Sequence, residues 1–310
     1  MPKLSNLGER SIVANLIRKF DPDGSLELGD DCGILDNGAD YLLLTTDMIT
    51  QATHMPHGSK PEDIGWYAAA INLSDIAAMG GRPIGMLFAL GLPRDTDAEW
   101  LDSLAYGIHE CCSSFDVPVL GGDTKENANI TISGTAIGRV PKDLILRRSG
   151  ARPGDILAMT GKLGRGVQWE RNQEDSTTLL KIHPRLMEGQ ILSSSGAVTS
   201  CIDMSDGLST SLHHLSRSSQ VGFRVEFASI PMMSGMDLAA KMKALHYGGD
   251  YELLITIKPS KMDAIEEMAC TKLTKIGEVT EDKEILLSSH GELGKLPDKG
   301  YEHFRKGWQK

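Results

Sequence analysis

Residues 61–81 read PEDIGWYAAAINLSDIAAMGG, and this stretch carries signals for both ends of a helix. Proline stands at the first helical position, acidic residues occupy the opening turn, and two glycines follow the last apolar residue. Spacings of four and three residues place Ile64, Ala68 and Ile71 on one face of this helix. Asp75 continues the series four residues later, and apart from it this face is apolar.

The carboxylate of Asp75 needs compensation, because burying an isolated charge on an apolar face costs free energy. The usual outcomes are a raised pKa, a paired cation or a bound metal ion. No Lys or Arg lies within 61–81 to pair with Asp75. The alternative is an aspartate at the periphery of the helix, satisfied by a backbone donor.

Strands are predicted on both sides of this helix, where β-branched or apolar runs are bounded by Gly, Pro or Asp. These runs lie at 26–35, where LELGDDCGIL alternates like a half-buried strand, and at 41–49, 83–93 and 129–140. A second helix is predicted at 97–115, followed by a short strand at 117–120.

The polar segment 147–155, RRSGARPGD, is the best candidate for a domain boundary, because it carries Pro and two Gly. Chains above about 250 residues usually form more than one core. We therefore expect one domain at 1–146 and a second at 147–310. In the second, strands predicted at 155–161, 198–205, 222–227, 250–258 and 284–289 alternate with helices at 184–195, 207–219, 234–245 and 259–270. This alternation favours a layered α/β or α+β domain.

The composition excludes several classes of protein. A net charge of -10 over 310 residues argues against a nucleic-acid partner, which would require clustered Lys and Arg. The longest strongly apolar stretch, 83–93, is too short to span a membrane, and no signal segment is recognisable at the start. Five cysteines without a C-x-x-C pair suggest neither a disulfide framework nor a zinc site. We expect a soluble, cytoplasmic protein.

Five further aspartates stand at the ends of apolar runs, where side chains converge on a shared rim. They are Asp31, Asp47, Asp123, Asp203 and Asp206. Each alone suits a cap or a turn. Two carboxylates ~4 Å apart repel by about 4 kcal/mol at an effective dielectric of about 20, so a packed set would need cations. Oxygen ligands without His or Cys favour Mg²⁺ or Ca²⁺.

Glycine-rich turns adjoin these acids in GDD, LGGDT and SDGLS. Glycine lets backbone N–H groups approach an anion, and a helix beginning near Asp206 would add its N-terminal dipole. Acids and glycines together suggest phosphates bridged by metal ions. Neither a Walker nor a Rossmann glycine motif follows a strand.

The order of these motifs resembles the thiamine-monophosphate kinase family of the aminoimidazole ribonucleotide synthetase superfamily. The matching segments are GDDC (29–32), TTD (45–47), NLSDIAAMG (72–80), GGDT (121–124), DMSDGL (203–208) and GYEHF (300–304). The resemblance implies an N-terminal α+β domain whose sheet pairs with its twin in a homodimer, and a C-terminal layered α/β domain. It also implies ATP bound between them and transfer of phosphate to thiamine monophosphate, giving thiamine diphosphate.

The resemblance assigns roles residue by residue. It implies that several Mg²⁺ ions are bound by Asp31, Thr45, Thr46, Asp47, Asp75, Asp123, Asp203 and Asp206. Of these, Asp31, Asp47, Asp75 and Asp123 are also expected to be catalytic. It implies that the nucleotide is bound by Tyr106, Gly122, Asp123, Arg148 and Ser205. It implies that His54 and Tyr301 contact the thiamine end of the acceptor. Without the resemblance, His54 would be read as a loop histidine and Tyr301 as a packing residue.

The chain departs from the family at 248–253, GGDYEL, where the family usually has GGEDYEL. Either Asp250 takes over the glutamate's contact with the thiamine ring or that contact is absent. Two alternatives stay open. One is another ATP-dependent synthetase of the superfamily, resembling selenophosphate synthetase or aminoimidazole ribonucleotide synthetase, and the other is a non-catalytic sensor of metal or nucleotide.

Overall fold

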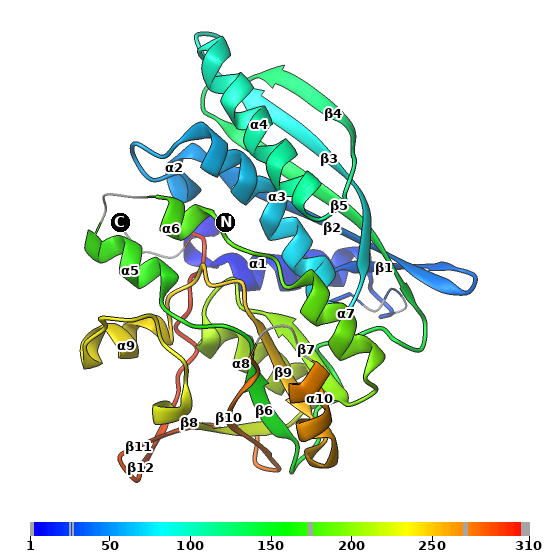
Figure 1. Cartoon of the computed structure of the whole chain (residues 1–310), viewed down its shortest axis with the longest axis vertical. Helices are drawn as coiled ribbons and strands as arrows, with labels where there is room; N and C mark the ends of the chain where they lie inside the picture. The colour runs from blue at the N-terminus through cyan, green and yellow to red at the C-terminus, as the bar shows by residue number, and fades with distance from the viewer. Residues whose placement is uncertain (1–2, 25, 27, 173–175, 269–271, 305–310) are drawn as a thin grey trace.

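The computed structural model of the chain describes residues 3–24, 26, 28–172, 176–268 and 272–304, which form two sheets with their helices (Figure 1). The first sheet has the order β1-β2-β5-β3-β4, and only its β3 and β4 run parallel to each other. Its strands are β1 (Gly33–Asn37), β2 (Asp40–Thr50), β3 (Arg82–Leu92), β4 (Val119–Glu126) and β5 (Thr131–Pro141).

The second sheet has the order β12-β11-β8-β10-β6-β9-β7. Its strands are β6 (Ile156–Met159), β7 (Val198–Asp203), β8 (Gly222–Glu226), β9 (Leu253–Ile257), β10 (Thr274–Thr280), β11 (Ile285–Ser289) and β12 (Glu292–Lys295). The described helices of three turns or more are α1 (Glu9–Phe20), α3 (Pro61–Ala78), α4 (Ala98–Ser114) and α8 (Leu208–Ser219). Shorter ones are α2 (Gln51–His54), α5 (Arg165–Asn172), α6 (Thr177–Leu180), α7 (Leu186–Ser194), α9 (Leu238–Ala244) and α10 (Met262–Met268). These mixed layers confirm the expected fold class.

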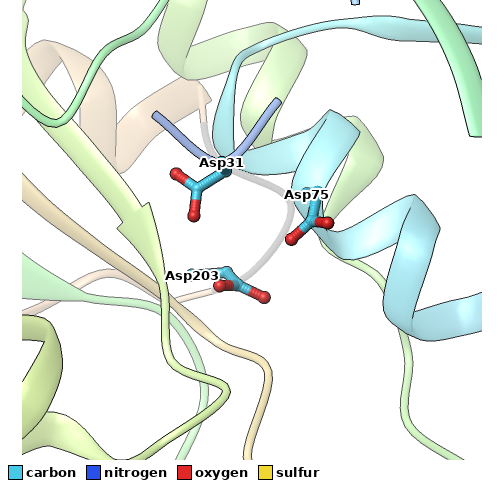
Figure 2. Close-up of side chains that lie close together, drawn as sticks. All are labelled: Asp31, Asp75 and Asp203. Carbon is cyan, nitrogen blue, oxygen red and sulfur yellow. The ribbon is translucent and has the colours of Figure 1, made fainter. Parts of the chain in front are cut away.

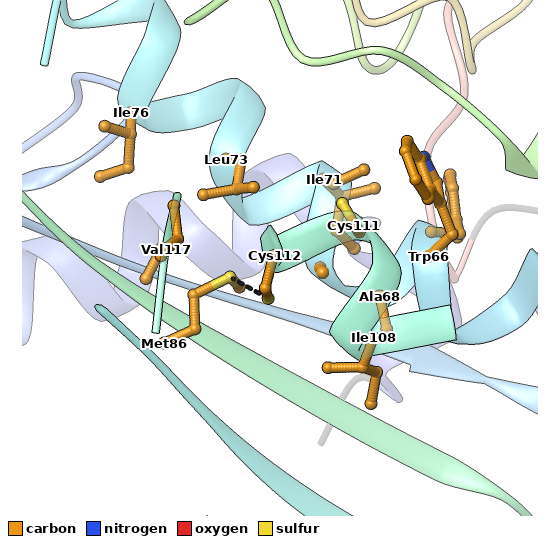
Figure 3. Packing of buried hydrophobic residues seen from close by; sticks show 14 of the residues in the cluster. Trp66, Ala68, Ile71, Leu73, Ile76, Met86, Ile108, Cys111, Cys112 and Val117 are labelled. Carbon is orange, nitrogen blue, oxygen red and sulfur yellow. Dashed lines mark hydrogen bonds between the residues drawn. The ribbon is translucent and has the colours of Figure 1, made fainter. Parts of the chain in front are cut away.

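Helix α3 begins at Pro61 and ends just before Gly80, as the sequence predicts. It is buried on nearly every side, because it packs against the first sheet, α4 and α7. Figure 3 shows its side chains meeting those of α4 and the sheet, where the Cys112 thiol lies 3.7 Å from the sulfur of Met86. Glycine permits this close approach, since a Cβ on Gly107 would lie 1.9 Å from a backbone oxygen of α3.

The two halves of the chain interlock at α3. The segment that contains α6 and α7 follows the first strand of the second sheet, yet it packs against α3. Leu180, Ile182 and Leu186 belong to the core of the first sheet, and the indole N–H of Trp66 donates to the carbonyl of Ile182 at 2.6 Å. Near its end α3 also contacts β7 of the second sheet, where the Ser74 hydroxyl bonds the carboxylate of Asp203.

The prediction of a strand at 26–35 is wrong for the residues before Gly33. In the described residues before Gly33 the chain is irregular, and β1 begins only at Gly33. Gly29 has a φ of 131°, and the carboxylate of Asp30 accepts the backbone N–H of Arg148 at 2.9 Å. The acidic pair thus turns away from the sheet toward the second half of the chain.

No helix within the described ranges is long and apolar enough to cross a membrane.

Candidate active site

Three carboxylates from distant parts of the sequence converge beneath α3 (Figure 2). Asp31 comes from the turn before β1, Asp75 from the last turn of α3, and Asp203 from the end of β7. One oxygen of each lies within 4.8 Å of the others. We call Asp31, Asp75 and Asp203 the acidic cluster. Since it joins both sheets, it forms only when the two halves are docked.

Neighbouring side chains orient the cluster. The Thr45 hydroxyl donates to Oδ2 of Asp75 at 2.5 Å, and the Ser74 hydroxyl donates to Oδ2 of Asp203 at 2.7 Å. The side-chain oxygen of Asn72 accepts the backbone N–H of Asp47 at 3.0 Å. Sequence reasoning missed Asn72 and Ser74, although their signal was present: both are polar residues within the most buried helix.

Arg148 reaches the cluster from the predicted boundary segment. Its guanidinium donates to Oδ1 of Asp31 at 2.6 Å and to the carbonyl of Gly29 at 3.1 Å. The other oxygen of Asp31 is buried and has no hydrogen-bond partner in the described part of the chain. The positive charge of Arg148 therefore offsets only part of the negative charge of the three carboxylates.

Burial and mutual repulsion raise the pKa of the carboxyl groups in this region. Burial, followed by the charges of Asp47 and Asp203, raises the pKa of Asp75 well above its ordinary value. Burial and the charge of Asp31 raise the pKa of Asp203 to about 8. Burial is also the main cause that raises the pKa of Asp47 to about 6 and the pKa of Asp206 to about 7. Such groups are expected where a cation binds when the protein functions.

The donor set fits a hard divalent cation. Carboxylate oxygens and a threonine hydroxyl are the ligands that Mg²⁺ and Ca²⁺ prefer, and no sulfur or imidazole atom joins the cluster in the described ranges. The buried, unpartnered oxygen of Asp31 is the kind of atom that a metal ion would satisfy.

The structure does not bring Thr46 and Asp123 to the cluster. Side chains of a strand alternate between faces, so Thr45 and Asp47 face α3 whereas Thr46 points to the opposite face. Asp123 belongs to a cross-strand row with Met48 on that same opposite face. It is exposed and forms an ion pair with Lys125 at 3.2 Å.

The predicted nucleotide residues other than Arg148 lie in three places. Tyr106 is exposed on α4, and Gly122 lies on β4, where a Cβ would be 1.8 Å from the carbonyl oxygen of Phe88. Ser205 lies in the loop between β7 and α8, beside Asp206. This loop presents the N-terminus of α8, a twelve-residue helix, next to Asp203.

The two predicted thiamine contacts come together. The rings of His54 and Tyr301 both pack against the ring of His303, with centroid distances of 5.4 and 4.8 Å. The backbone N–H of Tyr301 also donates to the carbonyl of Asp206 at 3.2 Å. We call His54, Tyr301 and His303 the aromatic group. Through Tyr301 it adjoins Asp206.

Only one of the two carboxylate oxygens of Asp250 has a hydrogen-bond partner in the described residues, because its Oδ2 is buried and unpartnered. Asp250 is buried, and its Oδ1 accepts the backbone N–H groups of Gly164 and Arg165 at 2.9 and 2.8 Å. These are the amides at the start of α5, so the carboxylate caps this helix. Glu252, the next acid of GGDYEL, is paired with Arg185 at 2.6 Å.

Comparison with known proteins agrees with this architecture. Residues 29–140 match the family model for the AIR synthase related protein, N-terminal domain, and residues 152–288 match its C-terminal domain. The chain is thus an AIR synthase-related protein with both domains.

Sequence relatives define the family more closely. The chain is 34% identical to the thiamine-monophosphate kinase of Pyrococcus horikoshii, over 98% of each chain. It is 33% identical to the Escherichia coli K12 enzyme, over 96% of this chain and 98% of that one. AaThiL complexed with AMPPCP and TMP superposes with a TM-score of 0.84 at 26% identity, covering 98% of this chain and 99% of the other. The chain belongs to the thiamine-monophosphate kinase family.

Proposed function

We propose that the protein transfers the γ-phosphoryl group of ATP to thiamine monophosphate, yielding thiamine diphosphate and ADP. The observation that carries this proposal is the acidic cluster, in which one oxygen of Asp31 is buried without a hydrogen-bond partner in the described residues. A non-catalytic sensor would need the same metal site but no acceptor site. The aromatic group beside Asp206 favours the kinase, because it offers a place for a ring.

Charge is the main obstacle to this reaction. A phosphate monoester has a second pKa of about 6, so the acceptor oxygen is largely ionised at neutral pH and needs no strong general base. The acceptor must approach a γ-phosphoryl group that is itself negative. Mg²⁺ held by the acidic cluster, Asp47, Asp206 and Thr45 would supply the neutralising charge.

The protein's own groups would position the two substrates. The N-terminus of α8 and Arg148 lie at the cluster and suit the polyphosphate of ATP. The Nε of Arg148 is buried and has no partner in the described ranges. His54 and Tyr301 suit the thiamine end, so the acceptor phosphate would extend from these rings toward Asp206.

Acceptor-dependent turnover tests the proposed function. We expect ADP release from ATP and Mg²⁺ to require thiamine monophosphate, and the product to be thiamine diphosphate. A rate of ADP release that does not depend on thiamine monophosphate would favour another synthetase of the superfamily. Nucleotide binding without any turnover would favour a sensor.

Transfer should be direct, because the ionised acceptor can attack in line and no side chain is needed as a relay. Rapid-quench experiments with γ-labelled ATP are expected to place label on thiamine diphosphate and none on the protein. Label trapped on the protein at a rate that matches turnover would contradict direct transfer.

Arg148→Ala should raise the KM for ATP about tenfold or more, the cost of losing a charge-assisted hydrogen bond, and raise the KM for thiamine monophosphate much less. Steady-state kinetics with each substrate varied in turn would measure both. Arg147→Ala is the matched control, since Arg147 pairs with Asp30 at 3.2 Å rather than with the cluster. Equal effects of Arg148→Ala on the two constants would refute the assignment to the nucleotide.

A homodimer formed over the bare face of the first sheet is also part of the proposal. Helices α3 and α4 lie on one side of this sheet (Figure 1). The opposite side exposes large apolar residues, namely Leu44, Met48, Ile84 and Leu87. Exposed apolar surface of this kind marks interfaces. Such a dimer would bury Thr46 and Asp123, the two predicted ligands that lie apart from the cluster.

Introducing charge on this face should separate the subunits. We expect Met48→Glu combined with Leu87→Glu to convert a dimer into a monomer in light scattering after size exclusion. Leu238→Glu, on the exposed surface of α9, is the control and should leave the dimer intact. A wild-type monomer at micromolar concentration would contradict the interface. The division at residue 146 and the cytoplasmic location stay predictions.

A further inference from the structure

The two ends of the chain clasp each other beside the predicted thiamine contacts. The backbone N–H of Glu9 donates to the carbonyl of His303 at 3.1 Å, and the N–H of His303 donates to Oε2 of Glu9 at 3.0 Å. Arg10 binds the same segment through Asp298 at 2.7 Å and Glu302 at 3.3 Å. Helix α1 is thus fixed with its first residue against His303.

His303 is the centre of the aromatic group. Its ring is tilted by 40° against His54 and stands edge-on to Tyr301, whose hydroxyl lies 3.2 Å from Nδ1 of His303. His54 is itself oriented, because its Nδ1 accepts the backbone N–H of Thr50 at 3.3 Å. A neutral His54 therefore carries its proton on Nε2.

Glu9 brings negative charge to this group. Its carboxylate, after burial, contributes to the raised pKa of both Asp206 and Tyr301. After burial and the charge of Asp31, it also contributes to the raised pKa of Asp47. Of its two carboxylate oxygens, only Oε2 accepts a hydrogen bond from the described residues. The contact with His303 therefore holds a carboxylate beside the aromatic residues, and its Oε1 has no hydrogen-bond partner in the described residues.

We propose that Glu9 and His303 bind the cationic ring system of the acceptor, together with His54 and Tyr301. The inference rests on the proposed function. Thiamine carries a permanent positive charge in an aromatic ring, and aromatic faces with a nearby carboxylate recognise such cations. The carboxylate of Glu9 accepts the backbone N–H of His303, which fixes a negative charge beside the residue whose ring packs against His54 and Tyr301. A ring bound here directs its phosphate toward Asp206.

Glu9→Gln tests the charge alone, because the amide oxygen can still accept the N–H of His303. We expect calorimetric titration with thiamine monophosphate, in the presence of Mg²⁺ and ADP, to show affinity reduced about tenfold. An acceptor analogue with a neutral thiophene in place of the thiazolium ring should bind wild type and Glu9→Gln equally. The KM for ATP should change less than about twofold.

Matched variants separate this role from a structural one. Glu302→Gln removes a charge from the same junction while keeping an acceptor for Arg10, and it should bind thiamine monophosphate like wild type. His303→Ala should lose more affinity than His303→Phe, which keeps a ring. Unchanged affinity in Glu9→Gln, or equal losses for the charged and neutral acceptors, would overturn the inference. Because the titration measures binding directly, its outcome is independent of whether the protein turns over, and failure of the proposed function would be seen separately in the turnover assay.

Discussion

Asp75→Asn is expected to abolish most Mg²⁺-dependent activity while preserving the fold. Changing a group that merely orients a metal ligand costs about 10- to 100-fold, so a residue at the centre of the cluster should cost more than about 100-fold in kcat. The fold should survive, because asparagine keeps the shape of the side chain and can still accept the hydroxyl of Thr45. Steady-state kinetics at saturating substrates would measure the loss.

Thermal unfolding gives an independent readout of the same variant. Burial and repulsion make the ionised Asp75 unfavourable without a cation, so metal-free Asp75→Asn should be at least as stable as wild type. The stabilisation that Mg²⁺ gives should shrink. Asp102→Asn, an exposed aspartate of α4, is the control and should alter neither property. An Asp75→Asn protein with the wild-type rate would show that the side chain is peripheral.

The stability of the metal-free protein should fall as pH rises. Folding raises the pKa of Asp47 to about 6, of Asp206 to about 7 and of Asp203 to about 8, from an ordinary value of 3.8. The folded protein therefore holds protons that the unfolded chain releases. The stability that these protons give is fully present below the pKa of the unfolded chain, and it is lost as pH rises through the pKa values of the folded protein.

Mg²⁺ should remove most of this dependence, because it favours the ionised carboxylates. Melting temperatures with EDTA and with saturating Mg²⁺ would test this, and we expect a larger Mg²⁺ stabilisation at about pH 8 than at about pH 5.5. Asp203→Asn should reduce the difference. A Mg²⁺ effect that is equal at the two pH values would contradict binding at these groups.

Local signals explain which parts of the fold were predictable. Helix α3 carries its own start and stop signals, so its ends and the apolar face with Asp75 follow from the sequence. The TTD segment within β2 also specifies through alternation that Thr46 faces away from Thr45 and Asp47. Helix α1 was missed, although Ile12, Leu16 and Phe20 recur at a helical spacing of four residues; in the structure it buries none of its residues.

Contacts between distant residues explain what the sequence did not predict. Asp31 was expected at a strand end, but its position depends on Arg148, 117 residues away. Glu9 belongs to no recognisable motif, and its place beside His303 depends on a contact between residues 294 positions apart in the sequence. Asp250 occupies a familiar motif, yet the amides of Gly164 and Arg165 already bind one of its two carboxylate oxygens.

Anomalous diffraction from crystals grown with Mn²⁺ and a non-hydrolysable ATP analogue tests the central claim most directly. We expect a manganese peak bound by carboxylate oxygens of Asp31, Asp75 and Asp203, with the phosphates of the analogue coordinated to it. We also expect the loss of this peak in Asp75→Asn. Manganese bound elsewhere, with Asp31 still paired to Arg148 and the cluster free of metal, would contradict a metal-binding role for these three carboxylates.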